Sequence, residues 1–159
     1  MSEKNLLSGN KKRKMRSASR LYALQALFQM EQSGQTADTV RSEFIDHRFG
    51  AEYDGEQLEE GDIDLFTQIL DEVVNHQAKI DQLTDKALVE KWPLGRIDPT
   101  LRALFRAAGA ELVNTETAPR IIIVEYVDLA GAFFPDGKEA SFVNAVLDHM
   151  AHKAYPDGF

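Results

Sequence analysis

A block of basic residues near the start of the chain is the clearest candidate for binding chemistry. The segment Lys11 to Arg20, KKRKMRSASR, holds six lysines and arginines. Clustered positive charge binds phosphate backbones because it releases their condensed counterions, so the segment predicts a site for a polyanion. The alternative is a solvated tail without a ligand, since blocks of like charge also repel one another.

Three of these arginines share one side of a predicted helix. At about 100° per residue, Arg13, Arg16 and Arg20 fall within a narrow arc that Leu24 and Leu27 continue. The pattern predicts a helix whose later turns are buried, while its first turns project beyond the core. An exposed helix N-terminus adds partial positive charge. We therefore predict phosphate contacts from this segment, made by Lys12, Arg13, Arg16 and Arg20.

The remainder of the chain is acidic. Residues 1–20 hold seven Lys/Arg and one acid, whereas residues 21–159 hold eleven Lys/Arg and 25 Asp/Glu. The formal net charge of −8 is thus a basic end of about +6 joined to a body of about −14. Such a body repels nucleic acid outside the basic end, and it suits a basic protein partner.

A second candidate contact lies near the end of the chain. Phe142 comes at a predicted helix start, shortly after a turn that contains Lys138. Proteins that bind single-stranded RNA stack unpaired bases on aromatic rings while basic side chains hold the phosphates. Phe142 is predicted to stack on a base with Lys138 nearby. The alternative is that its ring packs in the core.

Signals for catalysis are missing from the sequence. It contains no Gly-rich phosphate loop, no GxSxG and no HExxH, so we expect a protein that is not an enzyme and needs no cofactor. His149 and His152 stand beside Asp148, but no third convergent ligand is evident, so no metal site is predicted. The chain has no cysteine and no apolar run of the roughly 20 residues that span a bilayer. We expect a soluble cytoplasmic protein.

Helical periodicity covers nearly the whole chain and predicts an all-α fold of about seven helices. The β-branched run Arg120 to Val124 is assigned to a helix because Ile122, Tyr126 and Leu129 share one helical face. The predicted features after the first helix follow in chain order: a helix after Gly34 that Thr36 or Asp38 caps and that ends near Phe49-Gly50, a solvated acidic loop over 50–64, a helix bent near Asn75 to Gln77 and ending at 91–95, a helix capped by Asp98-Pro99, one from Pro119 to Pro135, and one from Lys138 to Tyr155.

Two packing relationships are also predicted. Small residues between Ala103 and Ala110 indicate that another helix approaches closely there. Glu125 is expected to be partly buried and to pair with a neighbouring arginine such as Arg102 or Arg106.

Four segments carry a resemblance to the NusB family, which spans almost the whole chain. They are RSASR leading into ALQALFQME (16–31), IDPTLRALFRAAGAEL (97–112), PRIIIVEYVDLAGAF (119–133) and ASFVNAVLDHM (140–150), and the most specific motif is FVNxVLD at 142–148. The resemblance implies two helical subdomains packed crosswise. We assign them to residues 16–76 and 77–159, after a basic flexible arm of residues 1–15.

The resemblance also implies a function. Members of the family bind the boxA element of single-stranded leader RNA in rRNA operons, together with the small-subunit ribosomal protein NusE, within the transcription elongation complex. By position, Arg16, Arg20 and Phe142 would face the RNA. The chain departs from the family pattern at Phe28, where tyrosine is common, and at Val124, where an asparagine usually precedes the glutamate.

Two other functions stay open. A NusB-like domain also occurs in rRNA cytosine methyltransferases, but these need a cofactor-binding domain and a catalytic cysteine, and this chain has no cysteine. The other alternative is a helical adaptor for proteins whose basic tail binds nothing specific.

Overall fold

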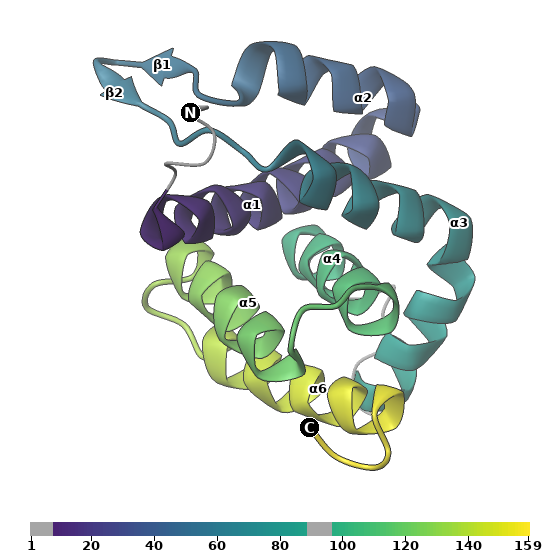
Figure 1. Cartoon of the computed structure of the whole chain (residues 1–159). Helices are drawn as coiled ribbons and strands as arrows, with labels where there is room; N and C mark the ends of the chain where they lie inside the picture. Colours follow the sequence, from purple (N-terminus) through teal and green to yellow (C-terminus); the bar gives the residue numbers. More distant parts are fainter. Residues whose placement is uncertain (1–7, 89–96) are drawn as a thin grey trace.

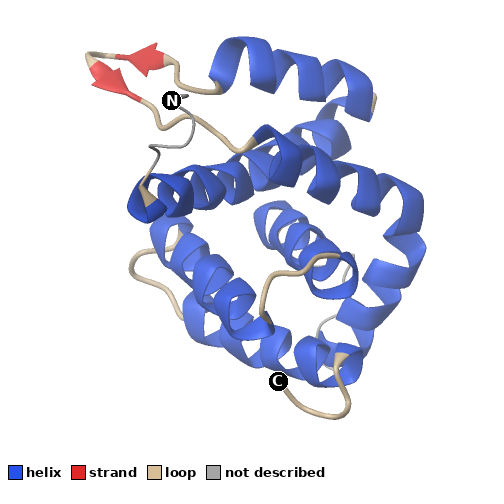
Figure 2. Cartoon of the chain, in the orientation of Figure 1, coloured by secondary structure: helices blue, strands red, loops and turns tan. Residues whose placement is uncertain are grey.

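The computed structural model describes residues 8–88 and 97–159, which are mostly helical (Figures 1 and 2). The described residues form six α-helices, which confirms the predicted all-α class and comes close to the predicted number. In chain order the elements are α1 (Gly9–Ser33), α2 (Ala37–Glu43), the π-helical turn η2 (Phe44–Arg48), the strands β1 (Glu52–Tyr53) and β2 (Glu56–Gln57), α3 (Ile63–Leu88), α4 (Pro99–Asn114), α5 (Pro119–Phe133) and α6 (Glu139–Ala154).

Helix α1 begins earlier than the sequence analysis placed it. The side chain of Ser8 caps the helix by accepting a hydrogen bond of 3.0 Å from the backbone N–H of Lys11. Residues 9–15, assigned to a flexible arm, therefore form the first turns of α1. The cap and the good helix propensity of lysine and arginine account for this extension. Gly34 ends the helix in the left-handed conformation at φ 74°.

The acidic loop contains a small hairpin that the sequence analysis did not predict. Strands β1 and β2 pair antiparallel, with Glu52 opposite Gln57 and all four strand residues exposed. Asp54 and Gly55 connect them with positive φ values of 51° and 82°. An Asp-Gly pair is the usual sequence of such a tight turn, so this dipeptide was the available signal. Figure 2 shows the hairpin projecting from the helices.

Helix α3 is kinked where a bend was predicted. His76 has non-helical φ and ψ of −134° and 29°, which confirms the bend expected near Asn75 to Gln77. The kink coincides with the boundary assigned between the two subdomains, and α3 turns there along the side of the molecule (Figure 1). The end predicted for this helix at 91–95 lies outside the described residues.

Helix α4 packs against four other helices, α1, α3, α5 and α6. Asp98 caps it through a 2.7 Å hydrogen bond from the Thr100 N–H, and Pro99 follows as predicted. A Cβ atom at Gly109 would lie 2.7 Å from Ile80 Cγ2 and 3.3 Å from Met150 Cε. The small residues of α4 therefore allow α3 and α6 to approach closely, which confirms that prediction.

A continuous hydrophobic core joins the two halves of the fold. At one end, the ring of Tyr22 stacks on Phe49 at 4.6 Å between centroids, and Phe44 stacks on Phe66 at 5.8 Å. None of the helices within 8–88 and 97–159 is both long and apolar enough to cross a membrane.

Candidate nucleic-acid interface

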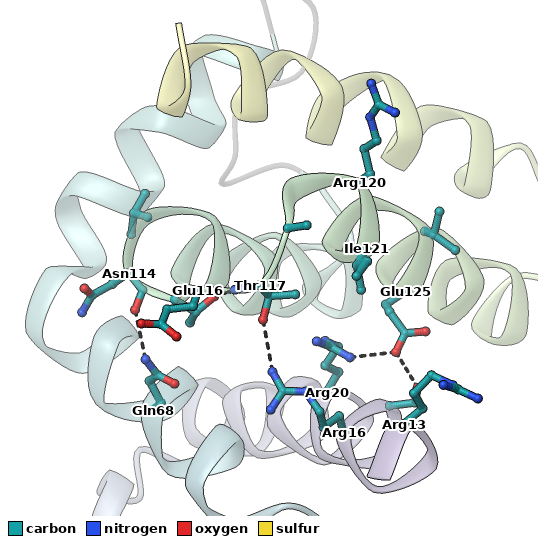
Figure 3. A pocket seen from close by; sticks show the side chains of 15 residues that line it. Arg13, Arg16, Arg20, Gln68, Asn114, Glu116, Thr117, Arg120, Ile121 and Glu125 are labelled. Atoms are coloured by element: carbon teal, nitrogen blue, oxygen red, sulfur yellow. Dashed lines mark hydrogen bonds and ion pairs between the residues drawn. The ribbon is translucent and has the colours of Figure 1, made fainter. Parts of the chain in front are cut away.

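A large groove of the described structure lies beside the basic end of α1 (Figure 3). It has a volume of about 1300 Å³ and runs between the first half of α1, the connection from α4 to α5, and the start of α5. Its lining residues are Arg13, Arg16, Ser17, Arg20, Gln68, residues 113–118, Arg120, Ile121, Val124 and Glu125.

Arg16 is positioned across this groove. Its Nη2 donates a 3.1 Å hydrogen bond to Thr117 Oγ1, and its Nη1 lies 3.5 Å from Asp62 Oδ2. The side chain is still 40% exposed, and a guanidinium has five N–H donors, more than these two contacts use. Arg16 is therefore oriented by contacts at the groove and can still bind an anion, as the sequence analysis predicted for it.

The preceding basic residues are freer. Lys12 and Arg13 are exposed, and neither forms a side-chain hydrogen bond or an ion pair with another described residue. Lys11, in contrast, pairs with Glu59 on the connection between the hairpin and α3. Arg13 lines the groove and Lys12 precedes it in the first turns of α1, and neither charge is neutralised by another described residue.

Arg20 occupies a different place from the one predicted. It is only 2% exposed, and its guanidinium binds Glu111 of α4 and Glu125 of α5. Burial opposes its charged form, but the hydrogen bond and charge of Glu111 raise the pKa of Arg20 above the ordinary value. Arg20 lies one turn further along α1 than Arg16, where the helix enters the core. The structure therefore makes Arg20 an internal ion-pair partner and does not present it to a phosphate.

The predicted partners of Glu125 were wrong. Arg106 donates hydrogen bonds of 3.1 and 3.0 Å to Asp81, and both Arg102 and Arg106 bind Glu31. These arginines belong to the side of α4 that faces the end of α1 and the second half of α3. Glu125, on α5, receives hydrogen bonds from Ser17 and Arg20 instead.

The groove also has an apolar wall that the sequence analysis missed. Ile121 is 52% exposed and Val124 is 58% exposed, and both line the groove. Figure 3 shows Ile121 and Glu125 pointing from α5 toward the arginines of α1, while Arg120 points away. Arg120 donates a 3.1 Å hydrogen bond to the backbone oxygen of Phe159. The sequence did contain a signal for this wall. Ile121 and Val124 lie three positions apart on α5 and outside the helical face of the buried Ile122 and Tyr126, so two apolar side chains were left on an exposed face.

Lys138 and Phe142 belong to a second, smaller groove of about 400 Å³ that shares no lining residue with the first. Lys138 is exposed at the N-cap of α6. Phe142 is half-buried, and its ring meets Phe105 edge to face at 6.0 Å. The ring thus packs against the core on one side and lines the groove with another part of its surface. Stacking on a base stays a prediction.

Possible metal ligands do not converge in the part of the chain that the structure describes, where no group of three or more His, Asp or Glu side chains could hold an ion. His152 instead places Nδ1 2.8 Å from the backbone oxygen of Asp148 within α6.

Comparison with known proteins gives consistent matches. The sequence model of the protein family described as "NusB family" matches residues 17–152 of this chain. The transcription antitermination protein NusB of Maricaulis maris (strain MCS10) is 44% identical over 147 residues, which cover 92% of this chain and 91% of that protein. T. maritima NusB superposes with a TM-score of 0.72 at 23% identity, covering 89% of this chain and 94% of that one. A structure described as "Crystal Structure of a Plectonemic RNA Supercoil" superposes with a TM-score of 0.71 at 24% identity, covering 88% of this chain and 95% of that one.

Proposed function

The chain belongs to the NusB family, and we propose that it acts in transcription antitermination by binding single-stranded boxA-type RNA of rRNA operon leaders. RNA binding is proposed because Arg16, a partly exposed cation, lines a large open groove. Arg16 is oriented by Thr117 yet remains 40% exposed, and Arg13 lines the same groove without an internal ion pair among the described residues.

An unpaired strand fits this groove better than a duplex. Single-strand binders combine a basic track for phosphates with surfaces on which bases lie flat. Here Arg13 and Arg16 would hold phosphates, Lys12 would extend the track along α1, and the exposed Ile121 and Val124 would contact bases. The RNA named in the description of one superposed structure agrees with an RNA ligand for this fold.

We further propose that the ribosomal protein NusE binds beside the RNA within the elongation complex. The acidic body of the chain suits a basic partner. Phe28 and Phe133 are 36% and 39% exposed and line one groove next to the second half of α1. Exposed aromatic side chains are common anchors of protein interfaces. A partner docked there would lie along the helix that carries the arginines. The role places the protein in the cytoplasm.

The alternatives predict different binding. An adaptor with a non-specific tail would bind all single strands alike, whereas the proposed function requires a preference for the boxA sequence. A catalytic role would require the cysteine of the related methyltransferases, which this chain does not have. Neither alternative uses the orientation of Arg16 by Thr117.

The experiment is a fluorescence anisotropy titration at a fixed salt concentration with a labelled boxA RNA and a scrambled RNA of the same composition. The proposed function predicts that the boxA RNA binds more tightly, and that adding NusE increases the difference. Equal affinity for both RNAs, with and without NusE, would support the adaptor and contradict this function.

A further inference from the structure

We propose that Glu125 selects among bases in the α1 groove by accepting a hydrogen bond from a base amino group, so that cytosine is preferred to uracil. This inference rests on the proposed RNA binding and adds a specificity-determining residue to it. It comes from the way the two oxygens of one carboxylate are used.

Glu125 has one oxygen engaged and one open. Its Oε1 accepts hydrogen bonds from Ser17 Oγ and from Arg20 Nη1, the latter at 2.7 Å. Its Oε2 receives no hydrogen bond from any donor in the described part of the chain, and the side chain is 23% exposed. Because Oε1 fixes the carboxylate and Glu125 lines the groove, Oε2 is a positioned acceptor there (Figure 3).

The negative charge of Glu125 is not cancelled by its partner. Arg20 also binds Glu111, which is fully buried, so one guanidinium serves two carboxylates. Counted over Arg20, Glu111 and Glu125, the cluster keeps a net negative charge beside the groove that Arg13 and Arg16 also line. A phosphate is favoured at these two arginines and repelled by the carboxylate of Glu125. A neutral group that donates hydrogen bonds fits the position at Glu125.

The surface beside Glu125 suits a base. Ile121 and Glu125 are four positions apart and so adjoin on α5, and Val124 extends the same apolar wall. A base lying against Ile121 and Val124 would remove their exposed apolar surface from water. Its flanking phosphates would then lie within the basic part of the groove.

The chemistry of the base edge sets the preference. Cytosine and adenine carry exocyclic amino groups that donate to a carboxylate, and guanine donates from its N1 and N2 positions. Uracil has a carbonyl oxygen where cytosine has its amino group, so it would bring a second acceptor against Oε2. Cytosine and uracil have the same shape but also differ at N3, which is an acceptor in cytosine and an N–H donor in uracil, so only a change confined to the N4 amino group isolates this contact.

The test uses anisotropy titrations with 12-nucleotide oligocytidine and oligouridine at one salt concentration. The wild-type protein is expected to bind the cytidine strand about tenfold more tightly, the effect of one hydrogen bond to a charged group. Cytidine methylated twice at N4 keeps the ring but has no amino N–H, so its strand is expected to bind as weakly as the uridine strand. This arm needs no protein variant.

Glu125→Gln supplies the second arm. Glutamine can keep an oxygen toward Ser17 and Arg20 while presenting an amide NH₂ to the groove, so the preference is expected to shift toward uridine. Asp128→Asn is the matched control, because it removes the same charge from an exposed position of α5 outside the groove lining. It is expected to leave the cytidine-to-uridine ratio unchanged. Thermal unfolding of each variant measures the stability of the fold.

Equal affinity of the wild-type protein for the cytidine, dimethylcytidine and uridine strands would overturn the inference. So would a Glu125→Gln effect of the same size on all strands, which would leave Glu125 as a structural partner of Arg20. Either result would leave the proposed function standing if the boxA RNA still bound more tightly than its scrambled control. Failure of every RNA to bind would overturn both.

Discussion

Arg20 donates two parallel hydrogen bonds to Glu111, from Nε to Oε2 at 2.8 Å and from Nη2 to Oε1 at 3.0 Å. A third, from Nη1 to Glu125 Oε1, measures 2.7 Å. The planar guanidinium matches a carboxylate in this two-point geometry, which lysine cannot reproduce. One side chain of α1 thereby holds both α4 and α5, and it fixes the groove in which Arg16 lies one turn earlier.

Replacing Arg20 should destabilise the protein strongly. Arg20→Ala leaves the buried carboxylate of Glu111 without its partner, and breaking a buried ion pair in this way costs about 3–5 kcal/mol. Arg16→Ala is the matched control, because its more exposed contacts should contribute less than about 1 kcal/mol. Urea unfolding of both variants measures the two losses. A similar small loss in both would show that the Arg20 cluster does not stabilise the fold.

The contrast between Arg16 and Arg20 also shows how far the sequence could predict the site. Local features were predictable from neighbouring residues, such as the cap at Asp98-Pro99 and the bend at His76. The helical arc placed both arginines on one face of α1 but could not show which of them is buried. That depends on Glu111 and Glu125, which are 91 and 105 positions away in the chain.

The same limit applies to the groove itself. The groove forms only when α5 packs beside α1. That packing brings Ile121 to the wall of the groove and lets Arg16 donate its hydrogen bond to Thr117. Glu125 was recognised as an ion-pair partner, but its arginine comes from α1 and not from α4. Residue types thus indicated the chemistry of the site, and tertiary packing decided which side chain meets which.

A substitution that removes only the flat ring of Phe142 tests whether this side chain stacks on a base. Phe142→Leu keeps most of the volume against Phe105 but removes the flat ring, so the free energy of unfolding should fall by less than about 1.5 kcal/mol. If the ring stacks on a base, RNA affinity should fall by about 1–3 kcal/mol. Anisotropy and urea unfolding separate the two effects. Reduced stability with unchanged RNA affinity would assign Phe142 to packing alone.

Stability should depend on pH through Glu31. Its hydrogen bond with Arg102 lowers the pKa of Glu31 in the folded protein, so in acid the unfolded chain binds a proton at this site more readily. The stabilisation by this pair is present above the ordinary glutamate pKa of about 4.3 and is lost as the pH falls through the lower folded value. Glu31→Gln should therefore lose less stability than the wild type between about pH 5 and pH 3. Parallel losses in both proteins would be inconsistent with a lowered pKa at Glu31.

RNA and the basic partner should strengthen each other's binding. If NusE docks near Phe28 and Phe133, it extends the surface that begins at Arg13 and Arg16, and the coupling should be about 1–3 kcal/mol. Thermodynamic linkage requires the same value from both directions, so RNA is titrated with and without NusE, and NusE with and without RNA. Affinities that do not change in either direction would indicate two independent sites.

The salt dependence of RNA binding tests the central claim most directly. Each phosphate contact on a single strand contributes about 0.7 to the slope of log affinity against log salt concentration. The variant Arg13→Ala/Arg16→Ala should therefore reduce the magnitude of this slope by about 1.4 while the protein stays folded. The measurement compares wild type and variant with boxA RNA over a series of salt concentrations. A slope identical to that of the wild type would contradict phosphate binding by these two arginines and, with it, the assignment of the α1 groove to RNA.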